Sequence, residues 1–105
     1  MERIKVNTKE ELIKVIKQEL ERQGPDADLN HVDVSEVTDM SALFVTTDAG
    51  NVKIDEWDVS NVIDMSGMFL FCYNFNSDIS KWNTSKVEYI SSLFYFCQNF
   101  NSYLS

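Results

Sequence analysis

The sequence has few of the residues that mark several classes of protein. One proline and three glycines in 105 residues exclude collagen-like and linker-like chains. Two cysteines can form at most one disulfide, which is too little to organise a small fold. No apolar run reaches the roughly 18 residues of a membrane span, and the first residues lack the features of a signal peptide. We therefore expect no membrane insertion.

Positive charge is also scarce, because 9 Lys and Arg stand against 17 Asp and Glu and give a net charge of -8. A protein that binds the phosphate backbone needs clustered basic residues, so we expect no nucleic-acid binding. The hydrophobic fraction of 44% and the aromatic fraction of 12% are too high for a disordered acidic tail. The length suits a single folded domain.

A helix is predicted near the amino terminus. Thr8 and Glu11 have the spacing of a capping box, in which the two residues satisfy each other's backbone amides. Gly24 followed by Pro25 is a stop signal for a helix. The apolar residues between these signals recur at helical spacing and form one stripe: Leu12, Ile13, Ile16 and Leu20.

The rest of the chain repeats itself every 25 residues. Residues 33–44, 58–69 and 83–94 align without insertion or deletion, and so do residues 72–80 and 97–105. A fixed period of this length is typical of a solenoid, in which each unit stacks on its neighbours. The apolar positions would then form columns, such as Val37, Val62 and Val87; Met40, Met65 and Ile90; and Phe44, Phe69 and Phe94.

This repeat resembles the BspA-type leucine-rich-repeat surface proteins of bacteria. The likeness is carried by residues 65–69, 72–76 and 79–87. More narrowly, the chain resembles the branch of that family with W-D-V-S-x-V-x-x-M-x-x-M-F repeats of about 25 residues. It covers about residues 29–105. The resemblance implies a leucine-rich-repeat-like solenoid, mostly on cell surfaces, that serves binding or adhesion.

We accordingly predict an α/β repeat fold, a short leucine-rich-repeat-like solenoid of three 25-residue coils with an amino-terminal capping helix. Residues 1–28 would form the cap, and residues 29–105 would form the solenoid. Within each coil, the Val-x-x-Met-x-x-Met-Phe spacing predicts a short helix or 3₁₀ segment. The coils would span residues 29–53, 54–78 and 79–105.

The two cysteines, Cys72 and Cys97, hold the same position in successive repeats. Stacked coils lie about 4.8 Å apart, whereas a disulfide needs Cβ atoms roughly 3.5 to 4.5 Å apart. We therefore expect a column of buried thiols, with a disulfide as the alternative. His31 is the only histidine, and nothing places it beside either thiol, so no catalytic or metal-binding residue is predicted.

Acidic side chains form partial columns in the repeat. Stacked carboxylates can bind calcium, or they can accept hydrogen bonds from backbone amides at turns and helix starts. Every acidic column loses its charge in the third copy, which favours the turn role over a row of calcium sites. The same acids can attract a basic protein partner. The columns are Asp33, Asp58 and Asn83; Asp39, Asp64 and Tyr89; and Asn30, Asp55 and Ser80.

Aromatic residues supply the candidate interaction surface. Several lie between the core columns, where we expect partial exposure, and exposed aromatic area marks interaction sites. Trp57 and Trp82 share a column with Val32 and lie near these aromatic residues, so we include them in the candidate surface. The candidate surface comprises Phe71, Tyr73, Tyr95, Phe96, Trp57 and Trp82.

The last coil would have no further coil to cover it. Solenoids normally shield such an end, because it carries apolar side chains and an open strand edge. We therefore predict an end-to-end homodimer through the uncapped carboxyl-terminal coil, with Phe100, Tyr103 and Leu104 as the candidate oligomer end.

The predicted function is a non-enzymatic module for protein–protein interaction or adhesion, of the kind that the resemblance implies. No cofactor is predicted, because repetition already explains each residue that a catalytic site would need. The alternative is a cytoplasmic acidic inhibitor or effector that binds a basic protein partner. The compartment stays open, since the resemblance implies a surface or secreted protein and the sequence shows no signal peptide.

Overall fold

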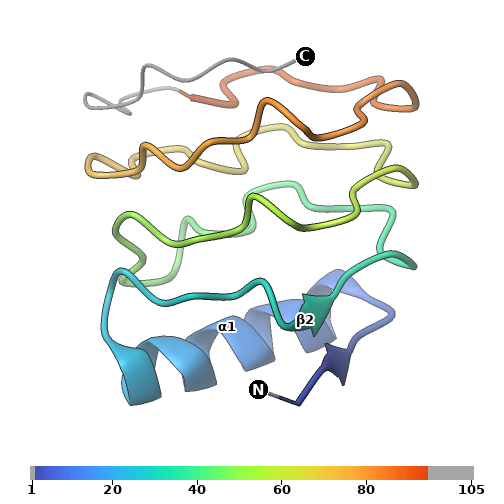
Figure 1. The fold of residues 1–105 in the computed structure, drawn as a ribbon. Coiled ribbons are helices and arrows are strands. Elements are labelled where there is room, and N and C mark those ends of the chain that lie inside the picture. Colours follow the sequence, from blue (N-terminus) through green and yellow to red (C-terminus); the bar gives the residue numbers. More distant parts are fainter. Residues whose placement is uncertain (1, 95–105) are drawn as a thin grey trace.

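The computed structural model describes residues 2–94, in which regular secondary structure is sparse. Strand β1 (Ile4–Lys5) precedes helix α1 (Lys9–Gln23), and strand β2 (Val32–Asp33) follows it. Figure 1 shows α1 at one end of the molecule, with successive non-helical passes of chain lying beyond it. We use the word pass for each 25-residue stretch after the helix; in the described chain the passes are residues 29–53, 54–78 and 79–94. The architecture depends on how these passes pack against one another.

The two strands join the amino terminus to the first pass. They pair in parallel, with Ile4 opposite Val32 and Lys5 opposite Asp33. The Ile4 amide donates to the His31 carbonyl at 2.9 Å, so the pairing extends to the residue before β2.

Helix α1 begins and ends at the residues that the sequence indicates. The Thr8 hydroxyl oxygen accepts a hydrogen bond from the Glu11 amide at 3.2 Å, while the Glu11 carboxylate accepts one from the Asn7 amide at 3.0 Å. Gly24 has a φ of 93°, and its amide donates to the Leu20 carbonyl at 2.8 Å. The predicted helix is confirmed, although Glu11 bonds the amide before Thr8. No helix in the described residues has the length and apolarity to cross a membrane.

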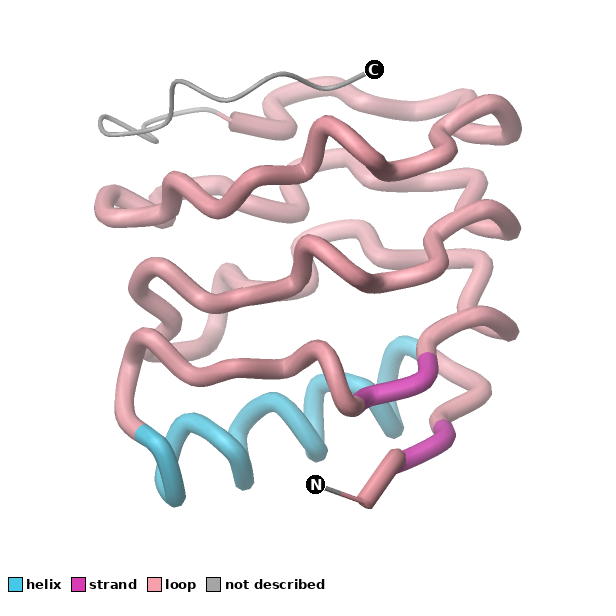
Figure 2. Tube along the Cα trace, in the orientation of Figure 1, coloured by secondary structure: helices cyan, strands magenta, loops and turns pink. Residues whose placement is uncertain are grey.

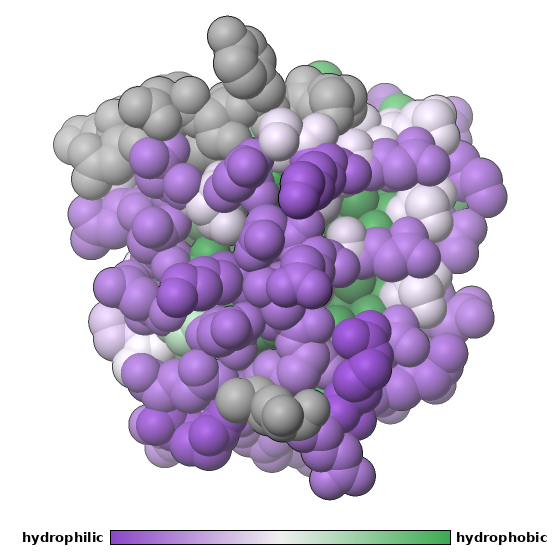
Figure 3. Space-filling model, viewed as in Figure 1, coloured by the Kyte–Doolittle hydropathy of each residue, from purple (hydrophilic) through white to green (hydrophobic). Residues whose placement is uncertain are grey.

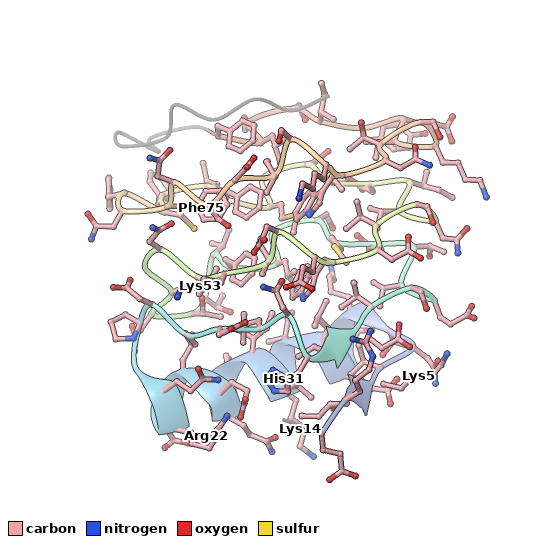
Figure 4. All side chains as sticks on the ribbon, in the orientation of Figure 1. Lys5, Lys14, Arg22, His31, Lys53 and Phe75 are labelled. Carbon is pink, nitrogen blue, oxygen red and sulfur yellow. The ribbon has the colours of Figure 1, made fainter. Side chains whose placement is uncertain are left out.

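A buried carboxylate fastens α1 to the loop that leads into β2. Glu19 accepts hydrogen bonds from Arg22 at 2.7 and 2.9 Å and from Gln23 at 3.0 Å. The Nε2 atom of His31 lies 2.8 Å from the same carboxylate, and Figure 4 shows His31 over the helix. Gln23 also exchanges two hydrogen bonds of 3.0 Å with the backbone of Asp28. The bond from Arg22 does most to lower the pKa of Glu19 to about 2, against the opposing effect of burial.

After β2, the passes are held in a 25-residue register. The Met40 amide donates to the Asp64 carbonyl at 2.9 Å, and the Met65 amide donates to the Tyr89 carbonyl at 2.8 Å. Isolated parallel bridges join Asp39 to Asp64 and Asp64 to Tyr89. Figure 2 shows these passes as loops and turns. The sequence repeat therefore specifies which backbone groups meet.

Each pass crosses the molecule and returns on its far side (Figure 1), and the buried apolar side chains lie between these two halves. The rings of Phe44, Phe69 and Phe94 stack with centroids 5.6 and 5.5 Å apart, and Phe75 stacks on Phe69 at 4.1 Å. The packing thus follows the repeat as closely as the backbone does. The repeated apolar positions that are buried include Leu29, Ile54, Ile79, Val37, Val62, Met40, Met65, Leu43 and Met68.

The fold class predicted from the sequence is wrong. We expected an α/β repeat, a leucine-rich-repeat-like solenoid of three 25-residue coils behind a capping helix. The described residues instead form a small compact globule with one helix and one two-stranded parallel sheet. Its radius of gyration of 12.3 Å is close to the value of about 13 Å expected for a compact domain of this length. The cause is local: in residues 2–94 the later passes meet at isolated bridges flanked by turns, and the predicted short helices are turns as well.

The stacked rings make Phe69 the most sensitive position in the core. Phe69→Ala should lower the free energy of unfolding by about 3 to 5 kcal/mol, because it opens a cavity among four rings. Urea unfolding followed by tryptophan fluorescence measures this change. Phe71→Ala, at a half-exposed ring, is the control and should cost much less. Equal losses in the two variants would contradict the packing described here.

The Glu19 cluster predicts a loss of stability in acid. Because the pKa of Glu19 is lowered from 4.5 to about 2 on folding, its contribution is complete above about pH 4.5 and is lost as the pH falls towards 2. Glu19→Gln should therefore be less stable than the parent at neutral pH, and the difference should shrink between pH 4.5 and pH 2. Thermal unfolding at a series of pH values measures it, with the exposed Glu21→Gln as the control. A difference that stays constant over this range would refute the assignment.

Candidate interaction surface

Large apolar side chains reach the surface at a few places in the described residues. Figure 3 shows one face, where hydrophilic residues cover most of the surface and hydrophobic residues show between them. Against such a background, a cluster of exposed apolar side chains is informative, whereas a single one is ordinary. The exposed members in residues 2–94 are Val45, Ile63, Phe71, Tyr73, Tyr89 and Ile90.

Two of these residues form an exposed aromatic pair. Phe71 is 46% exposed and Tyr73 is 49% exposed. Their ring centroids are 6.3 Å apart, with the planes tilted by 42°. The Tyr73 amide donates to the Phe71 carbonyl at 3.0 Å, so a tight turn holds the two rings together. The structure thus brings together two of the predicted surface residues.

The backbone at Phe71 is in the left-handed region, with a φ of 63°. A residue with a β-carbon pays roughly 1 to 2 kcal/mol for this conformation, which glycine adopts without that cost. Thr46 holds the same place 25 residues earlier, and it is not among the residues with positive φ. The positive φ at Phe71 is therefore absent from the equivalent turn one pass earlier, although Ala42 and Ser92 have it at another position of the repeat. Strain that persists at an exposed aromatic residue is typical of functional sites.

A surface pocket of about 680 Å³ lies one pass away from the aromatic pair. Thr46 and Asp48 line it, and they precede Phe71 and Tyr73 by 25 residues in the register. We call the two rings and the pocket together the Phe71 surface. The sequence analysis missed the pocket, because α1 and the turn around residue 47 meet only in the folded chain. The pocket is lined by Lys17, Leu20, Glu21, Pro25, Thr46, Thr47 and Asp48.

The other predicted surface residues are placed differently. Trp57 and Trp82 are buried, and their indole N–H groups donate to the carbonyls of Leu29 at 2.8 Å and Ile54 at 3.0 Å. They therefore belong to the core and cannot line an exposed surface. The remaining candidates lie outside the described residues: Tyr95 and Phe96, and the oligomer-end residues Phe100, Tyr103 and Leu104.

Cys72 is buried, as the repeat predicts for a thiol column. Its sulfur lies 3.9 Å from the carbonyl oxygen of Leu70. Cys97, the other member of the predicted column, lies outside the described residues.

Two of the three acidic columns act at turns, which is one of the two predicted roles, whereas Asp55 of the third accepts a hydrogen bond from the Asn30 side chain at 3.0 Å. Asp33 Oδ1 accepts hydrogen bonds from the Ser35 amide at 3.0 Å and the Ser35 hydroxyl at 2.7 Å. Asp58 and Ser60 repeat this pair at 3.0 and 2.6 Å. The serine hydroxyl does most to hold the pKa of each aspartate below its usual range. Within residues 2–94, no three His, Cys, Asp or Glu side chains are grouped so that they could hold a metal ion.

The positive φ at Phe71 predicts that glycine is tolerated better than alanine at this position. Phe71→Gly should be more stable than Phe71→Ala by about 1 kcal/mol, because alanine keeps the β-carbon that the left-handed region disfavours. Chemical unfolding of both variants measures the difference. Tyr73, which has no positive φ, is the matched site, and there alanine should equal or exceed glycine. Greater stability of the alanine variant at position 71 would show that the turn carries no such strain.

Comparison with known proteins places the chain in a family. No curated protein and no solved structure matches it. Over residues 13–105 the sequence matches the family described as Mycoplasma protein of unknown function, DUF285. That match begins within α1 and includes every later pass of the chain. The chain therefore belongs to the DUF285 family.

Proposed function

We propose that this chain is a non-enzymatic module for protein–protein interaction, and that the Phe71 surface binds the partner. The observation that carries the proposal is the strained, half-exposed Phe71 beside Tyr73. We further propose that the DUF285 family is allied to the BspA-type surface proteins that the repeat resembles. That alliance would make adhesion to another protein the function of this surface.

The aromatic pair supports the proposal because a partner that buries the two exposed rings would gain hydrophobic free energy. Two half-exposed rings keep apolar area in contact with water, and a partner would remove that area from water. Aromatic side chains are enriched among the residues that dominate binding energy at interfaces. A tight turn also keeps the two rings close together, so a partner can cover both at once.

The pocket supports the same proposal from the neighbouring pass. Leu20 and Pro25 supply apolar lining, while Lys17, Glu21 and Asp48 supply charges of both signs. A pocket with both apolar and charged lining suits an inserted side chain whose neighbours make polar contacts. A partner would thus be held by aromatic packing and oriented by charge.

A second candidate function is an acidic inhibitor or effector that binds a basic protein. Residues 29–105 carry ten acidic and three basic residues. Asp33 and Asp58 lie close enough for the charge of Asp33 to oppose the ionisation of Asp58, although Ser60 still holds the pKa of Asp58 low. Such a row of negative charge attracts basic partners at low salt.

Capture experiments separate the two candidates. The full chain is immobilised, and host and self lysates are passed over it at about 0.05 and 0.5 M salt. Capture through the Phe71 surface should survive the higher salt and be lost in Phe71→Gly and Tyr73→Ala. Ile63→Ala, which removes an exposed apolar side chain elsewhere, should leave capture unchanged.

The remaining outcomes decide against one or both candidates. Capture that disappears at the higher salt and survives Phe71→Gly would assign binding to the acidic columns. Capture that withstands both salt and the two aromatic substitutions would eliminate both proposed surfaces.

A further inference from the structure

The last described pass lies at the end of the molecule opposite α1, and within residues 2–94 no further pass pairs with its backbone edge. Figure 1 shows this pass farthest from the helix. Ile90 occupies the same place in the 25-residue register as Met40 and Met65, which are fully buried. Ile90 is 56% exposed and the adjacent Tyr89 is 57% exposed. A position that is core in two passes is therefore at the surface in the third.

In the earlier passes, one backbone carbonyl and one backbone amide form hydrogen bonds to the next pass. The Thr38 carbonyl accepts from the Ile63 amide at 2.8 Å and from the Asp64 amide at 3.4 Å, and the Met40 amide donates to the Asp64 carbonyl at 2.9 Å. The next pass repeats this arrangement: the Ile63 carbonyl accepts from the Glu88 amide at 2.8 Å and the Tyr89 amide at 3.3 Å, and the Met65 amide donates to the Tyr89 carbonyl at 2.8 Å. In each case a carbonyl and an amide two residues apart hold one residue of the following pass between them.

The corresponding groups of the last pass are the Glu88 carbonyl and the Ile90 amide. Neither has a hydrogen-bond partner within the described part of the chain. An edge with an open donor and an open acceptor is a template for pairing with another strand. The flanking Tyr89 and Ile90 side chains would be covered in the same event.

We propose that a second copy of this chain covers this edge, in an antiparallel pair with a two-fold axis beside Tyr89. The Ile90 amide of each copy would donate to the Glu88 carbonyl of the other. In the non-hydrogen-bonded type of antiparallel pair, two facing residues are flanked by two such bonds, each from the preceding carbonyl of one strand and the following amide of the other. The edge supplies that donor and that acceptor, so it is complementary to itself. Two-fold dimers are built on self-complementary surfaces of this kind.

The other passes of a second copy cannot serve as the partner. Their equivalent carbonyls and amides, at Thr38 and Met40 and at Ile63 and Met65, are already bonded within the chain. Strand β1 lies at the opposite end of the molecule, and pairing through it would join copies head to tail. Head-to-tail contacts build open assemblies larger than dimers, which makes the two arrangements distinguishable.

Charge determines how this dimer should respond to salt. Each copy carries a net charge of -8, so the approach of two copies is opposed by repulsion. Salt screens this repulsion, with a Debye length of roughly 10 Å at 0.1 M. The dimer should therefore tighten as salt is added. Binding of a basic partner to the acidic columns would weaken under the same change.

Sedimentation equilibrium of the full chain tests the proposal at rising protein concentration and at about 0.05 and 0.5 M salt. We expect a monomer–dimer equilibrium that shifts towards the dimer at the higher salt. Ile90→Asp should weaken the dimer at least about tenfold, because it places a charge on the paired edge. Val45→Asp, which places the same charge at an exposed aliphatic side chain of an earlier pass, is the matched control and should leave the equilibrium unchanged.

Amide hydrogen exchange tests the backbone pairing directly. Protection of the Ile90 amide should rise with protein concentration, whereas protection of the Met65 amide, already bonded to Tyr89, should not. Circular dichroism of Ile90→Asp verifies that the variant is folded, and Tyr89→Ala provides a second variant if it is not.

Four results would overturn the proposal: a monomer at every concentration, species larger than dimers, a dimer unaffected by Ile90→Asp, or dimerisation without concentration-dependent protection of Ile90. Phe71→Gly should leave the dimer intact, so this test and that of the Phe71 surface fail independently.

Discussion

The backbone hydrogen bonds between successive passes are the interaction on which the rest of the structure depends. Met40 and Met65 donate to carbonyls 24 residues further along, and the Trp57 and Trp82 indoles reach back to Leu29 and Ile54. Each bond has a donor residue that recurs 25 residues later, so the same hydrogen-bond arrangement forms again at the next pass. Only in this register do the buried phenylalanine rings fall over one another.

Both surfaces proposed for binding occur where this register is interrupted. At Phe71 the backbone turns into the left-handed region, unlike Thr46 at the same place one pass earlier, and an aromatic pair is exposed. At Glu88 and Ile90 the pass has no following pass among the described residues, so a carbonyl and an amide stay open. The repeated packing buries similar side chains at each pass, and both proposed binding surfaces lie where burial is incomplete.

Much of the local structure could be predicted from the sequence. Thr8, Gly24 and the apolar stripe between them define α1, because capping and helical spacing act over a few residues. Each aspartate two residues before a serine forms a turn, because its side chain meets a backbone amide close in sequence. The fold class was predicted wrongly, since a 25-residue period determines which groups meet and not whether the bridges extend into strands.

The sequence by itself determined α1, the turns at the aspartates and the 25-residue register, because each depends on neighbours along the chain or on an exact repeat distance. Only the tertiary structure decided that the tryptophans are buried, that Glu19 meets His31, and that α1 and the turn around residue 47 enclose a pocket. The Glu19–His31 contact and the pocket join segments whose separation follows no period, whereas the tryptophans are buried by packing that repeats from one pass to the next. Their geometry depends on the packing of the whole chain.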